Sequence, residues 1–181
     1  MIKAYLLIVY NLFRIALLKC LYGKRAQIHW VQRISPLCAL KFFNQGAMTI
    51  GRNTDFSAYC DFEVHGNGKL QIGDATYLNR FCMISAHDSV SIGSHCLFGP
   101  GVKIFDNNHK YSPESGVSTD LSTAPIRIGN HCWIASDVII LKGSTIGDNC
   151  VIGAGCIIHG NIPAGTVVKC KQELILDSQH S

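Results

Sequence analysis

The feature that most constrains this chain is a six-residue period in its aliphatic residues. In the second half of the chain an isoleucine returns at every sixth position: Ile128, Ile134, Ile140, Ile146, Ile152 and Ile158. A helix would repeat about every 3.6 residues and a strand about every two, so this period indicates a repeat architecture. The same period recurs upstream, with interruptions, over residues 50–62, 72–84 and 92–104.

The period predicts an all-β solenoid. Each hexad supplies a short strand and a corner, and three hexads close one triangular coil of about 18 residues, whose aliphatic side chains stack inward in columns. Neighbouring coils then pair as parallel strands, which satisfies the backbone. We expect a helical segment over residues 1–45, the solenoid over 46–168 and a short C-terminal tail over 169–181.

The cysteines fit the same pattern. Of the nine, six fall in the small inward position, four residues after an aliphatic one: Cys60, Cys82, Cys96, Cys132, Cys150 and Cys156. A buried free cysteine behaves as a small hydrophobic residue, so we expect these thiols to be structural. Cys20, Cys38 and Cys170 lie outside the pattern. The chain shows no cleavable signal peptide, which favours reduced thiols and a cytoplasmic location.

The N-terminal segment is mostly apolar. On a helix, Lys3, Arg14 and Arg25 fall on one narrow stripe with Asn11 nearby, and the longest uncharged run is ten residues, too short to span a bilayer. One interpretation is a helix in the membrane interface, with residues 1–25 on the lipid surface. The other is a helix packed against another subunit or the rest of the chain. A net charge of +4, without a dense basic stripe, excludes a typical nucleic-acid binder.

A resemblance to a known family narrows the function. The segment IGNHCWIASDVIILKGSTIGDNCVIGAGCIIHGNIPAG at 128–165, with YLNRFCMIS and KIFDNNH before it, resembles the hexapeptide-repeat acyltransferases. It is most similar to the branch that acetylates galactosides, maltose and surface-polysaccharide sugars, and covers about residues 50–168. The resemblance implies a left-handed parallel β-helix, a homotrimer with active sites between subunits, and acetyl-CoA as co-substrate. It implies no metal.

A polar segment interrupts the repeat at residues 105–125 and is rich in turn-forming residues. Long loops on rigid scaffolds commonly contain functional residues. This one contains His109, which matches the family's catalytic histidine and suits a general base near neutral pH. A backbone carbonyl or a carboxylate should orient its other nitrogen, and Asp106 and Glu114 are the candidate carboxylates.

Three residues are candidates for contacting the acceptor sugar. Asn79 matches an acceptor-contacting asparagine of similar enzymes, although an asparagine at a corner could equally serve a strained backbone. His87 stands where related sugar transferases place an acidic contact. Asp106 is the third candidate, because it lies beside the predicted base.

The resemblance also implies residues for the coenzyme. Trp133 points away from the coil interior and matches a tryptophan beside the CoA arm, although a subunit contact is the alternative. Ser136 and Ala154, one coil apart, match positions that contact pantetheine through backbone groups.

The phosphate end of the coenzyme is less well defined. Where the family usually has Thr-Lys, this chain has His159 and Gly160. Lys169 or Lys171 would then supply the positive charge, and His159 and Lys169 complete the predicted cofactor set.

The expected function is therefore an acetyl-CoA-dependent O-acetyltransferase for a capsule, O-antigen or exopolysaccharide sugar. The apolar N-terminal helix favours a lipid-linked acceptor at the inner membrane face. The alternatives are an N-acyltransferase for a soluble amino sugar or sugar nucleotide, and a non-catalytic scaffold. A zinc carbonic anhydrase of the same fold would need two histidines five residues apart, and no pair of the eight histidines has that spacing.

Overall fold

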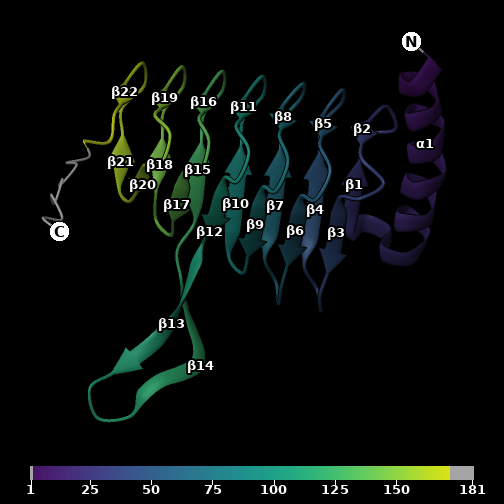
Figure 1. Cartoon of the computed structure of the whole chain (residues 1–181). Coiled ribbons are helices and arrows are strands. Elements are labelled where there is room, and N and C mark those ends of the chain that lie inside the picture. Colours follow the sequence, from purple (N-terminus) through teal and green to yellow (C-terminus); the bar gives the residue numbers. More distant parts are fainter. Residues whose placement is uncertain (1, 172–181) are drawn as a thin grey trace, which may run out of the picture.

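The computed structural model describes residues 2–171. It consists of one long helix, a triangular solenoid of short parallel strands and one projecting hairpin (Figure 1). The helix α1 (Ile2–Tyr22) is followed by the short 3-10 helix η1 (Gly23–Arg25). From Ala26 onward the chain visits three sheets in turn, which confirms the predicted β-solenoid.

The three walls of the solenoid are parallel sheets, which we name A, B and C in the order the chain visits them. Sheet A contains β1 (Ala26–Ile28), β4 (Ala47–Ile50), β7 (Lys69–Ile72), β10 (Ser89–Ile92), β15 (Ile126–Ile128), β18 (Thr145–Ile146) and β21 (Asn161–Ile162). Sheet B contains β2 (Arg33–Ile34), β5 (Asp55–Phe56), β8 (Tyr77–Leu78), β11 (Leu97–Phe98), β16 (Trp133–Ile134), β19 (Val151–Ile152) and β22 (Val167–Val168). Sheet C contains β3 (Ala39–Phe42), β6 (Asp61–Val64), β9 (Met83–Ala86), β12 (Lys103–Phe105), β17 (Ile139–Leu141) and β20 (Ile157–Ile158).

Aliphatic columns fill the interior, as the period predicts. In sheet C, Ile104 pairs with Ile84 on one side and Ile140 on the other, and Ile140 pairs with Ile158. All four are buried. Burying a side chain of this size contributes about 1.5–3 kcal/mol, so each column stabilises the stacking of successive coils.

The solenoid begins earlier than predicted. Ala26 pairs with Met48, so the first coil takes 22 residues, whereas Arg127 pairs with Thr145 and a later coil takes 18. The first coil already has the six-residue steps, since Ile28, Ile34 and Leu40 pair with the column residues of the next coil, so the predicted boundary at residue 46 is wrong. Of the predicted tail, residues 172–181 lie outside the described part of the chain.

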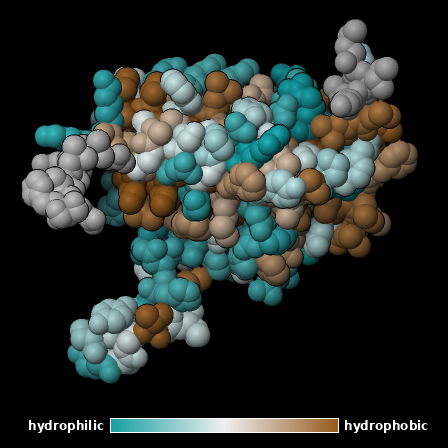
Figure 2. All heavy atoms as spheres, in the orientation of Figure 1, coloured by the Kyte–Doolittle hydropathy of each residue, from teal (hydrophilic) through white to brown (hydrophobic). Residues whose placement is uncertain are grey.

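Each coil has three corners, named here by the sheets they join. The predicted loop leaves at a C–A corner, between β12 and β15, and is a hairpin rather than an irregular loop. Its strands β13 (Asn107–Ser112) and β14 (Gly116–Thr123) are antiparallel. Figure 1 shows the hairpin projecting well away from the solenoid, and Figure 2 shows that its surface is largely hydrophilic.

The cysteines line the interior, and all six predicted inward thiols are buried. Several donate to a carbonyl of the next coil: Cys60 to Asn79, Cys82 to Gly99, Cys96 to Gly129, Cys132 to Gly147 and Cys150 to Pro163. Cys38, four residues after Ile34, is a seventh buried thiol in the same inward position of the first coil. A hydrogen bond to Cys60, together with burial, raises the pKa of the Cys38 and Cys82 thiols, whereas the same hydrogen bonds lower that of Cys60. Cys38 and Cys82 are therefore protonated packing groups.

The helix α1 covers the N-terminal end of the solenoid. Asn11 Nδ2 donates to Ile34 O at 2.9 Å, and Arg14 donates to Ser35 O at 3.2 Å and to Cys38 O at 2.6 Å. These carbonyls belong to the first coil, which has no preceding coil to pair with. The polar side chains of Asn11 and Arg14 therefore face the protein, which confirms the interpretation of a helix packed against the rest of the chain; the side chain of Lys3 lies outside the described part.

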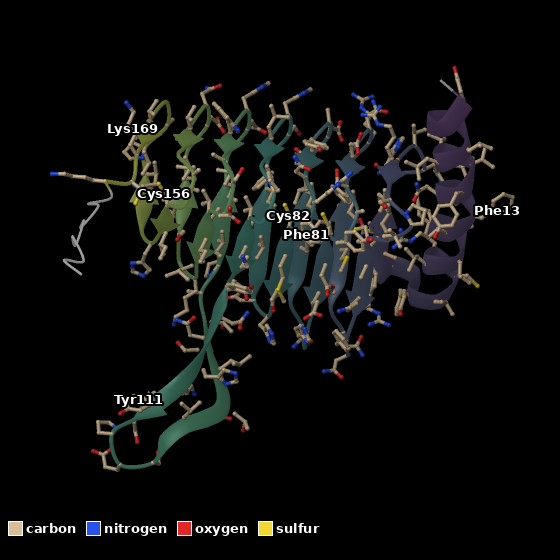
Figure 3. The ribbon with its side chains drawn as sticks, in the orientation of Figure 1. Phe13, Phe81, Cys82, Tyr111, Cys156 and Lys169 are labelled. Carbon is tan, nitrogen blue, oxygen red and sulfur yellow. The ribbon has the colours of Figure 1, made fainter. Side chains whose placement is uncertain are left out.

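The outward face of α1 is instead apolar. Its exposed large side chains are Tyr5, Leu6, Val9, Tyr10, Leu12, Phe13, Leu17 and Leu21. Figure 2 shows hydrophobic atoms gathered at this end of the molecule, and in Figure 3 Phe13 points away from the solenoid. By length and composition alone, residues 5–25 could also cross a membrane. The longest uncharged run, of ten residues, did not indicate this.

Candidate functional site

His109 lies on the projecting hairpin, opposite Leu121 of the partner strand, and is exposed. Its Nδ1 is 3.0 Å from Ser118 O. Because a carbonyl can only accept, Nδ1 is the protonated nitrogen in the neutral ring, and Nε2 is left as the base. The ring is thus oriented by a backbone carbonyl. Which carbonyl this would be depends on the hairpin register, so the sequence could not identify Ser118.

Asp106 does not contact this histidine. It is fully buried, and its carboxylate accepts from the backbone N–H of His87 at 2.8 Å and of Asp88 at 2.8 Å. Asn107 Nδ2 also donates to it, at 3.2 Å. The prediction that Asp106 touches the acceptor is therefore wrong, because the side chain holds the hairpin base to the preceding coil. Glu114 is exposed near the hairpin tip, beyond β13.

His87 lies at the corner directly below the hairpin. Its ring stacks on His65 with centroids 4.4 Å apart, and His65 stacks on Phe43 at the same distance. Burial and the neighbouring His65 lower the pKa of His87. A neutral imidazole is therefore favoured at this position, next to the base of the hairpin.

Asn79 lies at a different corner, where sheet B meets sheet C. It directly follows β8, and its Oδ1 accepts from the Arg80 N–H at 2.8 Å, which leaves Nδ2 as the amide's donor. Its backbone N–H donates to Phe98 O of the next coil. The corner is therefore well fixed, and the amide is placed on the outer surface of the solenoid.

Three of the predicted coenzyme residues lie on sheet B or at the B–C corner: Trp133, Ser136 and Ala154. Trp133 is exposed on sheet B, between Leu97 and Val151 of the adjacent strands. Ser136 lies at the B–C corner, and Gly155 N donates to Ser136 O at 2.9 Å. This bond places Ala154, the residue before Gly155, in the coil next to Ser136, which confirms the predicted stacking of these two positions.

Lys169 and His159, the two residues predicted for the phosphate end of the coenzyme, lie at different corners. Lys169, labelled in Figure 3, follows β22 of sheet B, the sheet that contains Trp133, and lies next to Gly153. His159 follows β20 and lies at the C–A corner. Within one chain His159 is therefore separate from the other residues of the set, and its role stays a prediction.

One chain does not bring the predicted base and the predicted binding residues together. The hairpin with His109 leaves the C–A corner, whereas Asn79 and Ser136 lie at the B–C corner. An open cavity of about 840 Å³ lies elsewhere, near Lys19 and Arg52 at the N-terminal end. Within the described residues, no three His, Cys, Asp or Glu side chains are grouped to hold a metal ion.

Comparison with known proteins agrees with this architecture. The family model described as bacterial transferase hexapeptide (six repeats) matches residues 125–160. The chain is 31% identical over 134 residues to the putative lipopolysaccharide biosynthesis O-acetyl transferase WbbJ of Escherichia coli (strain K12), covering 69% of this chain and 68% of that one. It is 36% identical over 119 residues to the galactoside O-acetyltransferase of the same strain, a match spanning 66% of this chain but only 58% of that enzyme.

Solved structures share the fold. A maltose O-acetyltransferase from Clostridium difficile 630 superposes with a TM-score of 0.58 at 24% identity, over 89% of this chain and 82% of that one. A hexapeptide-repeat acetyltransferase from Vibrio cholerae O1 biovar eltor, complexed with acetyl-CoA, gives 0.59 at 24% identity, over 65% and 63%. The fold is therefore the predicted left-handed β-helix, and the chain belongs to the hexapeptide-repeat O-acetyltransferase family.

Proposed function

We propose that this chain is an acetyl-CoA-dependent O-acetyltransferase that acts on a sugar hydroxyl during surface-polysaccharide synthesis. The observation that supports it most is the hydrogen bond from His109 Nδ1 to Ser118 O, which leaves Nε2 as an exposed base. The relatives named for galactoside acetylation and lipopolysaccharide synthesis support the choice of a sugar acceptor.

The chemistry needs no covalent intermediate on the protein. His109 Nε2 takes the proton of the sugar hydroxyl while the oxygen attacks the thioester carbonyl of acetyl-CoA. The C–S bond then breaks, the imidazolium returns its proton to the leaving thiolate, and the products are the O-acetyl sugar and free CoA. The Ser118 carbonyl stabilises the imidazolium by accepting from Nδ1. The buried cysteines take no part.

The coenzyme is proposed to lie along sheet B and the B–C corner. Trp133 offers an exposed aromatic surface to the pantetheine arm, and Ser136 and Ala154 offer backbone groups in two successive coils. Lys169 lies on the same side, toward the C-terminal end, where a cation would meet a phosphate. The acceptor would lie on the other side of the thioester, near Asn79 and beside His87 at the hairpin base.

The active form is proposed to be a homotrimer in which the hairpin of one chain reaches the B–C corner of the next. The separation of His109 and Asn79 on different corners supports this arrangement. Co-assembly of two inactive variants, His109→Ala and Asn79→Ala, should restore about a quarter of the wild-type activity, since random pairing places both intact residues at one interface in four. Activity that never rises above that of either variant would contradict a shared site.

The outward face of α1 is proposed to rest on the inner face of the membrane, where it would bring the enzyme to a lipid-linked acceptor. Its eight exposed large apolar side chains support this contact, and the chain as a whole is cationic. Phe13→Asp should weaken cosedimentation with phosphatidylglycerol vesicles, whereas Val117→Asp on the exposed hairpin should not. Equal binding by both variants would exclude α1 as the contact.

The reaction class is tested by the product. Radiolabelled acetyl-CoA is incubated with the full chain and a panel of neutral and amino sugars, and the labelled product is treated with mild alkali. An O-acetyl ester releases acetate under these conditions, whereas an N-acetyl amide is stable. Label that is stable to alkali would identify an N-acyltransferase. Absence of any transfer would favour the alternative that the chain is a non-catalytic scaffold.

A further inference from the structure

Two aromatic side chains form an exposed stack at the B–C corner. Tyr59 and Phe81 lie in successive coils with ring centroids 5.3 Å apart and planes 7° from parallel. Their exposed fractions are 57% and 59%. Large aromatic side chains usually bury most of their surface. Phe81, which Figure 3 labels, lies only two residues from Asn79 in the sequence.

Packing of the chain does not explain why a phenylalanine occupies this position. The backbone of Phe81 has φ of +62° and that of Tyr59 +63°, a conformation that bulky residues rarely adopt. At the equivalent point of later coils the chain has Gly101, Asp137 and Gly155. Seven other described non-glycine residues share this conformation, His95 and His131 among them, so the corners impose it, and what distinguishes this corner is the bulk of its side chains.

Among the residues that the structure describes, the Phe81 ring stacks on one aromatic ring, that of Tyr59, on its N-terminal side. The next position along the corner is Gly101, which has no side chain. Asp137 follows one coil further, and its Oδ1 would come within 2.2 Å of a Cβ built on Gly101. The carboxylate therefore reaches back over Gly101 and lies in the coil next to the Phe81 ring.

This combination fits a sugar. The negative face of an aromatic ring attracts the C–H groups of a pyranose, while a carboxylate accepts from its hydroxyls and an amide N–H donates to them. We propose that Phe81, Asp137 and Asn79 form a carbohydrate subsite at the B–C corner, in which one hexose of the acceptor stacks on the open face of Phe81. The subsite rests on the proposed function, and it predicts that the acceptor is a glycan bound through the face of one of its sugar rings.

The test measures sugar binding without acetyl-CoA. Saturation transfer from the aromatic protons of the full chain is recorded to the methyl glycosides of galactose, glucose and N-acetylglucosamine. Phe81→Asn removes the ring and keeps the fold, because Asn44, Asn53 and Asn149 already adopt this conformation. The matched control is His95→Asn, an exposed side chain in the same backbone conformation at the A–B corner.

Wild type and His95→Asn should transfer saturation to at least one glycoside. In Phe81→Asn the saturation transferred to that glycoside should be at least fivefold lower. In the acetylation assay Phe81→Asn should raise KM for the sugar about tenfold and leave KM for acetyl-CoA unchanged. Equal transfer in Phe81→Asn, or none from wild type, would overturn the subsite. A change of oligomeric size in Phe81→Asn would also overturn it, because the ring would then be a subunit contact. Sugar binding without acetyl transfer would refute only the proposed function.

Discussion

Replacing Asp106 by alanine should both destabilise the chain and slow the reaction. The carboxylate is the acceptor for two backbone N–H groups, those of His87 and Asp88, and it is fully buried. Each N–H left without a partner costs about 1–3 kcal/mol, so the free energy of unfolding should fall by about 2–6 kcal/mol. Asp106→Asn keeps one oxygen acceptor and should lose less.

The same bonds hold the hairpin to the preceding coil, so their loss should displace His109. A displacement of about 1 Å can cost about 10²-fold in rate, and we expect kcat to fall by that order in Asp106→Ala. Stability is measured by urea unfolding at fixed protein concentration, and kcat by release of free thiol. Glu114→Ala, at the exposed tip of the same hairpin, should change neither. Wild-type stability and kcat in Asp106→Ala would refute the anchoring role.

Three further predictions follow from single side chains. Trp133→Ala should raise KM for acetyl-CoA about tenfold with kcat retained at saturation. KM is measured from initial rates, and an unchanged KM would show that Trp133 does not contact the coenzyme. Cys96→Ala should remain active and lose about 1 kcal/mol in urea unfolding, since the thiol only packs and donates to a carbonyl; a folded but inactive variant would contradict its structural role. Because the folded state lowers the pKa of His87, the unfolded chain binds the proton more readily, so stability should fall as the pH drops from about 7 to 5. His87→Asn should flatten that dependence in thermal unfolding, and an unchanged slope would show that His87 is not responsible.

The inward positions of the solenoid could be predicted because they depend only on spacing. The isoleucine column through Ile104 and Ile140 and the buried thiols lie where a six-residue period places them. The first coil has the same six-residue steps, at Ile28, Ile34 and Leu40, and could have been predicted by extending the period upstream. Cys38, four residues after Ile34, would then have been assigned to the interior.

The roles of Arg14 and Asp106 were harder to predict, because the role of a polar side chain depends on which groups it contacts in the fold. Arg14 belonged to a cationic stripe for which a lipid surface and a protein contact were both open, and it donates to carbonyls of the first coil. Asp106 is close to His109 in sequence, but it precedes the strand and turns into the core, while the histidine points outward. Phe81 could have been noticed by aligning the coils, since a bulky aromatic occupies a position that later coils give to Gly101 and Asp137.

The measurement that tests the central claim most directly is sugar-dependent thiol release from acetyl-CoA by wild type and by His109→Ala. If His109 is the base, kcat should fall by about 10²–10⁴-fold while KM for acetyl-CoA is unchanged, because the base takes a proton from the sugar hydroxyl and does not hold the coenzyme. A wild-type kcat in His109→Ala would contradict the assignment of His109 as the general base, and with it the proposed mechanism of acetyl transfer.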